Sequence, residues 1–387
     1  MYCTRKITDD LIWIGANDRQ HPVFEAAHPV PRGMSYNSYL LLDEKTVLFD
    51  TVDRSVQTQF LENLEHALGG RPLDYIFVHH MEPDHAATLG DLMLRHPEAK
   101  IVCNGKAVNM IRQFHATDPS GAILVNEGDT LSTGRHNFTF VAAPMVHWPE
   151  VVVSYDSTDK ILFSADGFGK FGALEQEGEW LDEARRYYLN IVGKYGAQVQ
   201  ALLKKAAGLD IRTICPLHGP VLRENLGYYI GKYDIWSRYQ PEDEGVLIAY
   251  ASIHGNTARA AGLMRSILEE QGCPKVSVMD LCRCDQSEAV AEAFRYGKMV
   301  AMSSTYDGGL FPPMDQFMAH LRDKTYRSRR VALIENGSWA PSAAKHMRAF
   351  LEGMKDITIC ETVHTIQGAV KESDIAAMKE IAGELLG

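Results

Sequence analysis

The segment from His79 to His85 constrains the fold of this chain more than any other part of its sequence. It reads HHMEPDH and follows directly on Tyr75–Val78, an apolar run of the kind that forms a buried strand. Five of its seven side chains can bind a metal ion, and open sheets place their ligands at the carboxyl ends of strands. Because carboxylates held close together are costly to desolvate without a cation, the segment favours a metal site over a solvated loop with an incidental histidine pair.

Three later segments offer further metal ligands. His147 lies in VHWP, Asp166 in SADG and His218 in PLHG, and each segment comes just after a predicted strand. Taken singly, these residues are more often a buried histidine, a turn residue before a glycine and a loop residue. Together with the first segment they form a coherent set of imidazole and carboxylate ligands.

Short β-rich runs alternate with helical patterns up to about residue 240, which indicates an α/β sheet protein. Apolar residues recur at helical spacing from Phe60 to Leu68, with Asp53 as a candidate N-cap and Gly69 just past the end. A long helical stretch from about Glu179 to Ala206 is expected to cover a face of a sheet. The predicted strands are Lys45–Asp50, Asp74–Val78, Lys100–Cys103, Phe138–Ala143, Val151–Tyr155, Lys160–Ser164 and Arg212–Cys215.

A polar segment, Tyr239–Gly245, separates this part from a second one. The chain has 387 residues, enough for two or three domains at roughly 150 residues each. After the segment the pattern restarts with a central-strand run and then repeats strand and helix, which predicts a doubly wound parallel sheet. We therefore expect domains over residues 1–240 and 245–387. The strands predicted in the second domain are Val246–Ala251, Lys275–Met279, Met299–Ser303, Val331–Ile334 and Ile357–Thr362.

The loop after the first of these strands, SIHGNT, leads straight into a predicted helix and brings hydroxyl and backbone N–H groups to its N-terminus. This arrangement is typical of a phosphate site. Two later loops also follow predicted strands, and they contain glycines that let the backbone approach a flat ring and aromatic side chains, Tyr306 and Trp339, that can stack on it. No GxGxxG follows a strand, so FMN fits better than a dinucleotide. The candidate FMN-binding residues are Ser252, Ile253, His254, Gly255, Asn256, Thr257, Ser304, Thr305, Tyr306, Asp307, Gly308, Gly309, Asn336, Gly337, Ser338, Trp339 and Ala340.

The metal motifs resemble a known pattern. HxHxDH followed by His, Asp and His at strand ends is the metallo-β-lactamase order, and here Glu82 takes the place of the second histidine. With this HxExDH form, HWP around His147, GMSYNSYLL at 33–41 and LHGP around His218, the chain resembles the flavodiiron proteins over about residues 10–380. The resemblance implies an N-terminal metallo-β-lactamase-like αββα sandwich followed by a flavodoxin-like doubly wound parallel sheet.

The resemblance also implies roles for individual residues. Asp166 would bridge two iron ions, and the seven ligands would form the catalytic site. His79 is left outside the ligand set, and Glu25 or His28 is a candidate neighbour of the metals. One iron would be held by His80, Glu82 and His147, and the other by Asp84, His85 and His218.

By the same resemblance, FMN would pass electrons to two irons that reduce O2 to water or NO to N2O. The partners implied are an external electron donor, such as rubredoxin or a reduced deazaflavin coenzyme, and a second copy of the chain in a head-to-tail homodimer or a dimer of dimers. No CxxC pair follows the second domain, so no rubredoxin extension is expected. The ligands do not indicate whether O2 or NO is preferred.

Composition narrows the other possibilities. A net charge of −11 disfavours nucleic acid, and no apolar run is long enough to span a membrane. The start lacks the apolar core of a signal peptide, and the seven cysteines are scattered, so we expect a cytoplasmic protein. Cys282 and Cys284 lack the CxxC spacing and are expected to be ordinary thiols.

Two other functions remain open from the sequence. The first is a dizinc hydrolase with a regulatory flavodoxin-like domain, against which Glu82 argues, because a carboxylate is a harder ligand than imidazole and suits iron. The second is a redox carrier or gas sensor with purely structural metals, which are usually held in closed and thiolate-rich sites.

Overall fold

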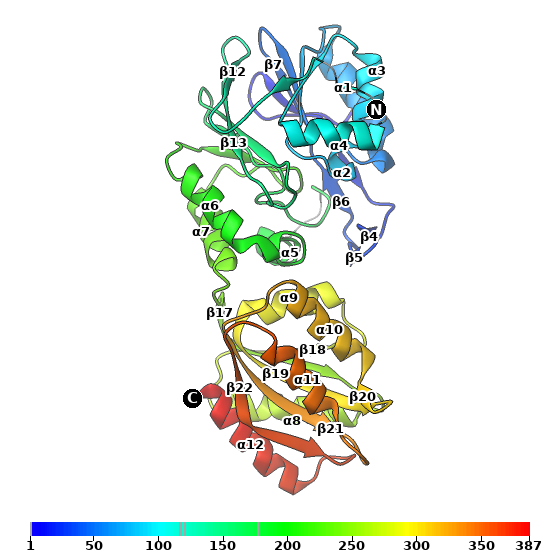
Figure 1. Cartoon of the computed structure of the whole chain (residues 1–387), viewed down its shortest axis with the longest axis vertical. Coiled ribbons are helices and arrows are strands. Elements are labelled where there is room, and N and C mark those ends of the chain that lie inside the picture. The colour runs from blue at the N-terminus through cyan, green and yellow to red at the C-terminus, as the bar shows by residue number, and fades with distance from the viewer. Residues whose placement is uncertain (1, 116–117, 120, 176–177) are drawn as a thin grey trace. The chain divides into compact units, whose positions relative to one another are not determined.

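The computed structural model describes residues 2–115, 118–119, 121–175 and 178–387, and the chain divides into two compact units (Figure 1). Unit 1 comprises Met1–Tyr188 and Ala197–Tyr233, and unit 2 comprises Leu189–Gly196 and Asp234–Gly387. The metal-binding motifs all lie in unit 1, and the candidate FMN loops all lie in unit 2.

The first sheet of unit 1 has seven strands. β1, β2, β7 and β8 pair antiparallel, and β8 to β11 continue as parallel strands. In sheet order these are β1 (Arg5–Lys6), β2 (Leu11–Trp13), β7 (Tyr39–Leu42), β8 (Thr46–Phe49), β9 (Tyr75–Phe77), β10 (Lys100–Cys103) and β11 (Ile123–Leu124).

The second sheet of unit 1 has five strands, antiparallel except for the parallel pair β15 and β16. Its strands are β12 (Thr130–Ser132), β13 (Asn137–Ala142), β14 (Val152–Asp156), β15 (Ile161–Phe163) and β16 (Thr213–Cys215). Two short antiparallel pairs stand apart from both sheets, and they are β3 (Ala16–Asp18) with β6 (Met34–Tyr36) and β4 (Val23–Phe24) with β5 (His28–Pro29).

An apolar core joins the two sheets. Phe49 of the first sheet stacks on Phe163 of the second with ring centroids 3.9 Å apart, and Phe77 meets Phe138 edge-on at 5.3 Å. All four rings are buried, and each buried aromatic side chain of this kind is worth about 3 to 5 kcal/mol against truncation to alanine. The core therefore fixes the strand ends from which the candidate metal ligands project.

Helices cover the outside of both sheets in Figure 1, with α1, α3 and α4 beside the first sheet and α6 and α7 beside the second. This αββα arrangement confirms the fold expected for the first part of the chain. The helices are α1 (Gln57–Leu68), α2 (Pro83–Ala86), α3 (Leu89–Arg95), α4 (Gly105–His115), α5 (Trp180–Tyr187), α6 (Gly196–Ala206) and α7 (Leu226–Ser237).

Two helical predictions need refinement. Asp53 caps the short 3₁₀ turn Arg54–Val56 that leads into α1, and Gly69 ends α1 in the left-handed conformation, as expected. The predicted stretch from Glu179 to Ala206 is helical but not continuous: α5 passes into a π turn, Tyr188–Val192, and a 3₁₀ turn, Gly193–Tyr195, before α6 begins. The glycines in this stretch weaken a regular α-helix.

Unit 2 is built on a parallel sheet in the order β18–β17–β19–β21–β22, with β20 paired antiparallel to β19. By chain position this is the order 2-1-3-4-5 of flavodoxin-like folds, which confirms the predicted class. The strands are β17 (Asp243–Ala251), β18 (Val276–Asp280), β19 (Tyr296–Tyr306), β20 (Gly309–Leu310), β21 (Arg329–Asn336) and β22 (Ile357–Ile366).

Helices α8 (Asn256–Glu270) and α12 (Glu372–Leu386) pack on one face of this sheet through a shared apolar core. The other face carries α9 (Gln286–Arg295), α10 (Pro312–Asp323) and α11 (Ala343–Glu352) (Figure 1). Among the helices that the structure describes, none is both long and apolar enough to cross a membrane.

Candidate metal centre and cofactor site

The loop after β9 is held by two buried carboxylates. Asp50 accepts hydrogen bonds from the backbone N–H groups of His79 at 2.7 Å and of His80 at 3.3 Å, and Glu150 accepts one from Met81 at 2.8 Å. Helix α2 then starts at Pro83, whose fixed φ suits the first helical position. These contacts give the ligand-bearing loop one defined path.

The first group of candidate ligands comprises His80, Glu82, His147 and Asp166. Glu82 Oε2 lies 3.2 Å from His80 Nε2 and 3.0 Å from His147 Nε2. Asp166 Oδ2 lies 3.2 Å from each of the same two nitrogens. The four ligand atoms lie within 4.8 Å of one another, as donors around one ion must.

The second group comprises Asp84, His85 and His218. Asp84 Oδ2 lies 3.2 Å from His85 Nε2 and 3.1 Å from His218 Nε2, and the two nitrogens are 3.0 Å apart. The other oxygen of Asp166, Oδ1, lies 3.2 Å from His85 Nε2 and 3.8 Å from His218 Nε2. Asp166 therefore turns one carboxylate oxygen to each group.

Several of the converging ligand atoms make no hydrogen bond, although His80 Nε2 pairs with Glu82 Oε2 and His85 Nε2 with His218 Nε2. Both oxygens of Asp84, both oxygens of Asp166 and Nε2 of His147 are buried and have no hydrogen-bond partner among the described residues. Buried polar atoms are normally paired, so atoms this close but not aimed at each other fit a shared cation in their midst. The mixture of imidazole and carboxylate donors, without thiolate, fits iron. The residues present therefore fit two metal ions.

Outer hydrogen bonds orient the ligand histidines. His80 Nδ1 lies 2.8 Å from Glu150 Oε1, and His218 Nδ1 lies 2.6 Å from the backbone oxygen of Ser35. Each contact fixes the ring so that Nε2 faces the ligand group. Glu150 and Ser35 were not predicted from the sequence, although Glu150 directly follows HWP and Ser35 lies within GMSYN.

His79 lies outside both ligand groups. Its Nδ1 is 2.5 Å from Asp50 Oδ2 and its Nε2 is 2.8 Å from the Ser154 hydroxyl, and all three side chains are buried. It therefore ties the end of the β9 segment to the second sheet, next to the ligand-bearing loop.

Charge within the site keeps the carboxylates ionised. Burial opposes the charged forms, but the neighbouring histidines hold the pKa values of Glu82 and Asp166 below their usual range. Burial likewise lowers the pKa of His147, yet the carboxylates of Asp166 and Glu82 outweigh it and raise that pKa to about 9. Metal binding must therefore displace protons from histidine, which makes affinity pH-dependent.

Glu25 approaches the same group from the turn between β4 and β5, where it has a left-handed φ of 49°. Burial and the nearby carboxylate of Glu82 raise the pKa of Glu25 to about 8. His28 lies farther off, with Nε2 4.0 Å from Glu25 Oε2. Of the two sequence candidates, Glu25 is the one beside a candidate metal ligand, Glu82.

The turn that carries Asp166 is also fixed by its neighbours. Ser164 donates a hydrogen bond from its hydroxyl to the oxygen of Gly167 at 2.7 Å. The N–H of Phe168 donates to the Tyr233 hydroxyl at 2.6 Å, and Trp180 Nε1 donates to the Phe168 oxygen at 3.1 Å. Tyr233 and Trp180 thus act as positioning residues that the sequence did not reveal.

The candidate FMN loops in unit 2 all follow parallel strands that are neighbours in the sheet. Residues 252–255 follow β17, residues 304–309 cover the end of β19 and its turn into β20, and residues 336–340 begin at the last residue of β21. Carboxyl ends of adjacent parallel strands meet at one edge, so the three predicted loops are brought together there.

The loop before α8 has the features of a phosphate cradle. Gly255 has a φ of 91°, and a Cβ there would meet nothing within 4 Å. Its N–H lies 3.1 Å from the Ser252 hydroxyl, and the Thr257 hydroxyl lies 3.1 Å from that of Ser304 in the next loop. An open N-terminus on a 15-residue helix, lined by hydroxyls, fits a phosphate group.

Exposed aromatic side chains surround the same edge. Trp339 is 83% exposed and Tyr306 is 44% exposed, which is unusual for such large side chains and fits stacking on a planar ring. Asp307 and Gly308 form the left-handed turn between β19 and β20. The sequence missed Gly368, which exchanges two hydrogen bonds with the Asn336 side chain. The residues present therefore fit FMN.

Known proteins are similar to this chain over most of its length. Residues 34–219 match the family model described as ODP family beta lactamase. The chain is 29% identical over 358 residues to the anaerobic nitric oxide reductase flavorubredoxin of Klebsiella pneumoniae, covering 89% of this chain and 74% of that protein. The corresponding protein of Vibrio vulnificus is also 29% identical, over 90% of this chain and 73% of its own.

Solved structures match both units together. The rubredoxin oxygen:oxidoreductase of the anaerobe Desulfovibrio gigas superposes with a TM-score of 0.93 at 26% identity, covering 99% of this chain and 98% of that one. The flavodiiron protein of Giardia intestinalis superposes with a TM-score of 0.94 at 24% identity, covering 100% and 96%, and supports the fold.

Proposed function

Because the chain belongs to the flavodiiron protein family, we propose that it is an oxidoreductase that reduces O2 to water, NO to N2O, or both, at a diiron site supplied with electrons by FMN. The observation that carries the proposal is the position of Asp166, whose two oxygens face two separate ligand groups at 3.2 Å. A carboxylate shared in this way keeps two metal ions close enough to act on one small substrate.

Each iron has its own proposed ligands. His80, Glu82 and His147 would hold one ion and Asp84, His85 and His218 the other, and Asp166, which turns one oxygen to each group, would be shared by both. Two bound irons supply the change of valence and the electrophilic positions for a diatomic molecule. The chain's own part is to keep these donors ionised and buried, and to orient the imidazoles through Glu150 and the Ser35 carbonyl.

Glu25 is the proposed proton-bearing group beside this site. Burial and the neighbouring carboxylate of Glu82 raise its pKa to about 8, which favours the protonated carboxyl. Reduction of O2 to water, or of NO to N2O and water, consumes protons, so a carboxylic acid at the edge of the ligand group can deliver one and be reprotonated from solvent. Burial and the negative carboxylates also raise the pKa of Tyr187, so its phenol stays neutral beside His218.

In unit 2 the proposed role of the chain is to bind FMN without a covalent link. The SIHGNT loop and the start of α8 take the phosphate, and the loops around Tyr306 and Trp339 take the ring. Bound FMN supplies a carrier that accepts electrons singly or in pairs and passes them on.

An external donor reduces the FMN in this proposal, either rubredoxin or a reduced deazaflavin coenzyme. The rubredoxin-type names of the relatives from Klebsiella pneumoniae and Desulfovibrio gigas favour rubredoxin as the first to test. We further propose a head-to-tail homodimer, or a dimer of such dimers, in which FMN of one copy serves the irons of the other.

The test is turnover of O2 and of NO by iron- and FMN-loaded protein with chemically reduced rubredoxin. Wild type is compared with Asp166→Asn and with Asp156→Asn, a matched change at a buried aspartate that pairs with His136 away from the ligand groups. The proposal requires turnover in wild type and Asp156→Asn and its loss in Asp166→Asn. Equal activity of Asp166→Asn, or full activity with zinc in place of iron, contradicts it.

A further inference from the structure

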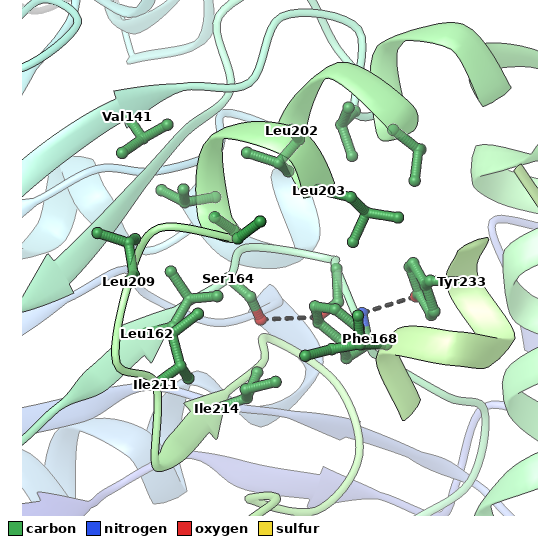
Figure 2. Close-up of a pocket in the computed structure, with 17 residues that line it drawn as sticks. Val141, Leu162, Ser164, Phe168, Leu202, Leu203, Leu209, Ile211, Ile214 and Tyr233 are labelled. Atoms are coloured by element: carbon green, nitrogen blue, oxygen red, sulfur yellow. Dashed lines mark hydrogen bonds between the residues drawn. The ribbon is translucent and has the colours of Figure 1, made fainter. Parts of the chain in front are cut away.

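A cavity of about 220 Å³ lies in unit 1 between the second sheet and the helices α6 and α7 (Figure 2). The sheet contributes Val141, Leu162 and Ile214 to its wall, and α6 contributes Leu202 and Leu203. These sheet side chains lie on the face opposite the core between the two sheets. The cavity is therefore a separate apolar space under the outer helices.

The cavity offers almost nothing to which water can hydrogen-bond. Ser164 and Tyr233 are the polar side chains among its described lining residues, and both hydroxyls are already engaged. Figure 2 shows these two hydrogen bonds, one from Ser164 and one to Tyr233 from the N–H of Phe168. A bound water needs two to four polar partners, whereas an apolar cavity of about 150 Å³ stays dry and takes up xenon or benzene. A small apolar molecule is thus the favoured occupant.

Two loops that carry proposed metal ligands form the floor of the cavity. Val146 directly precedes His147, and Gly167 directly follows Asp166, and both line the cavity. The floor residue Val146 is 3% exposed, and Ile214 in the adjoining wall is fully buried. The cavity thus ends against the segments that carry two of the proposed metal ligands.

The opposite end lies near solvent. Ala207 and Ile230 are exposed, and Leu203 and Ala206 are half-buried, yet all four line the cavity. Its lining therefore runs from the molecular surface at the end of α6 to the fully buried floor. A molecule without hydrogen-bonding groups loses nothing by leaving water along this path.

We propose that this cavity is a binding site for the apolar gas substrate, O2 or NO, which it collects from solution next to the metal-bearing loops. The inference rests on the proposed function, because O2 and NO are the substrates assigned there. Both are small, neutral and weakly hydrated, so an apolar and dry cavity concentrates them, while water and charged reductants are excluded.

Xenon is the probe for the site, because it binds apolar cavities and is not reduced. We expect xenon to bind in the cavity of the holoprotein, detected by ¹²⁹Xe NMR or in crystals under xenon pressure. Ala206→Phe fills the cavity, whereas Ala201→Phe makes the same change at an exposed position of the same helix that does not line it. Xenon binding is expected to disappear in Ala206→Phe and to persist in Ala201→Phe.

Kinetics then connect the cavity to turnover. Ala206→Phe is expected to raise KM for O2 about threefold or more with kcat and iron content unchanged, and Ala201→Phe to leave both constants as in wild type. If Ala206→Phe folds poorly, xenon pressure on the wild-type protein provides the second test. Xenon bound in the cavity is expected to raise KM for O2 and leave kcat unaltered.

Two results overturn the inference: absence of xenon from the cavity of wild type, or an unchanged KM for O2 and for NO when the cavity is filled. A different result overturns the proposed function instead. If wild type binds xenon in the cavity but consumes neither O2 nor NO with any reduced donor, the cavity stands as an apolar gas site and the assigned reaction is wrong.

Discussion

Glu150 provides the sharpest single perturbation of the metal centre, because it touches a ligand without being one. Its Oε1 accepts from Met81 N–H at 2.8 Å and lies 2.8 Å from His80 Nδ1, and the side chain is 1% exposed. Glu150→Gln keeps the size and one acceptor but removes the charge, so a charge-assisted hydrogen bond to His80 becomes a neutral one of about half the strength.

The expected magnitude follows from this geometry. Loss of an outer carboxylate partner of a ligand histidine typically weakens metal binding about 10- to 100-fold, or about 1.4 to 2.8 kcal/mol. Only the iron held by His80 should be affected, because His85 and His218 have no contact with Glu150 among the described residues. Under limiting chelator, iron per chain should therefore fall from about two toward about one.

The assay is iron content after anaerobic competition with a graded chelator, in wild type, Glu150→Gln and Asp156→Asn. Asp156 accepts from buried His136 at 2.8 Å, so its substitution removes the same kind of hydrogen bond at a residue outside both proposed ligand groups. Asp156→Asn should retain both irons at every chelator concentration that leaves wild type loaded. Equal iron affinity of Glu150→Gln and wild type, or equal loss in both variants, would refute the reasoning.

Three further predictions concern the cofactor, the pH dependence and the metals. Gly255→Ala should weaken FMN binding about tenfold or more. Gly272→Ala imposes the same left-handed strain at the other end of α8 and should leave FMN binding unchanged, and fluorescence titration with FMN compares the two variants. Burial lowers the pKa of His136 but Asp156 and Asp10 raise it to about 9, so its stabilisation is full below about pH 6.5 and is lost as pH rises through 9. Urea unfolding should therefore show the advantage of wild type over His136→Gln shrinking by about 2 kcal/mol between those values, and a constant difference would count against the pairing. Removing iron with a chelator should lower the free energy of unfolding by about 2.7 kcal/mol per site relative to protein held at iron concentrations of about 100 times Kd, and thermal unfolding at matched pH measures it.

In the two sheets of unit 1 and the parallel sheet of unit 2, strands were predictable from the sequence where their apolar runs are regular. Lys100–Cys103 coincides with β10, and the strand expected at Val246–Ala251 lies within β17. The short strands between residues 16 and 36 were not predicted, and neither were β1, β2, β7, β11 and β12. Each of these strands has only two to four residues and depends on pairing partners elsewhere rather than on its own pattern. Breaks in the 179–206 helix likewise depend on packing that periodicity does not report.

The residues of the candidate site were likewise predictable only in part. The seven proposed ligands stand at strand ends and have side chains that suit metals, so residue type and position indicated them together. Glu150 and Ser35 were missed because their contacts with His80 and His218 span 70 and 183 residues, and neither residue type is distinctive alone. Gly368 was missed for the same reason, since only the fold brings it to Asn336.

The most direct test of the central claim is the stoichiometry of a single turnover. Protein loaded with FMN and two irons stores four electrons when fully reduced, and reduction of O2 to water requires four electrons. Mixing anaerobically reduced protein with a small excess of O2, without any external donor, should therefore consume about one O2 per chain, reoxidise the flavin and release no hydrogen peroxide. Hydrogen peroxide formed in step with the O2 consumed, or a reduced protein that reacts with neither O2 nor NO, would contradict the assignment of a diiron reductase.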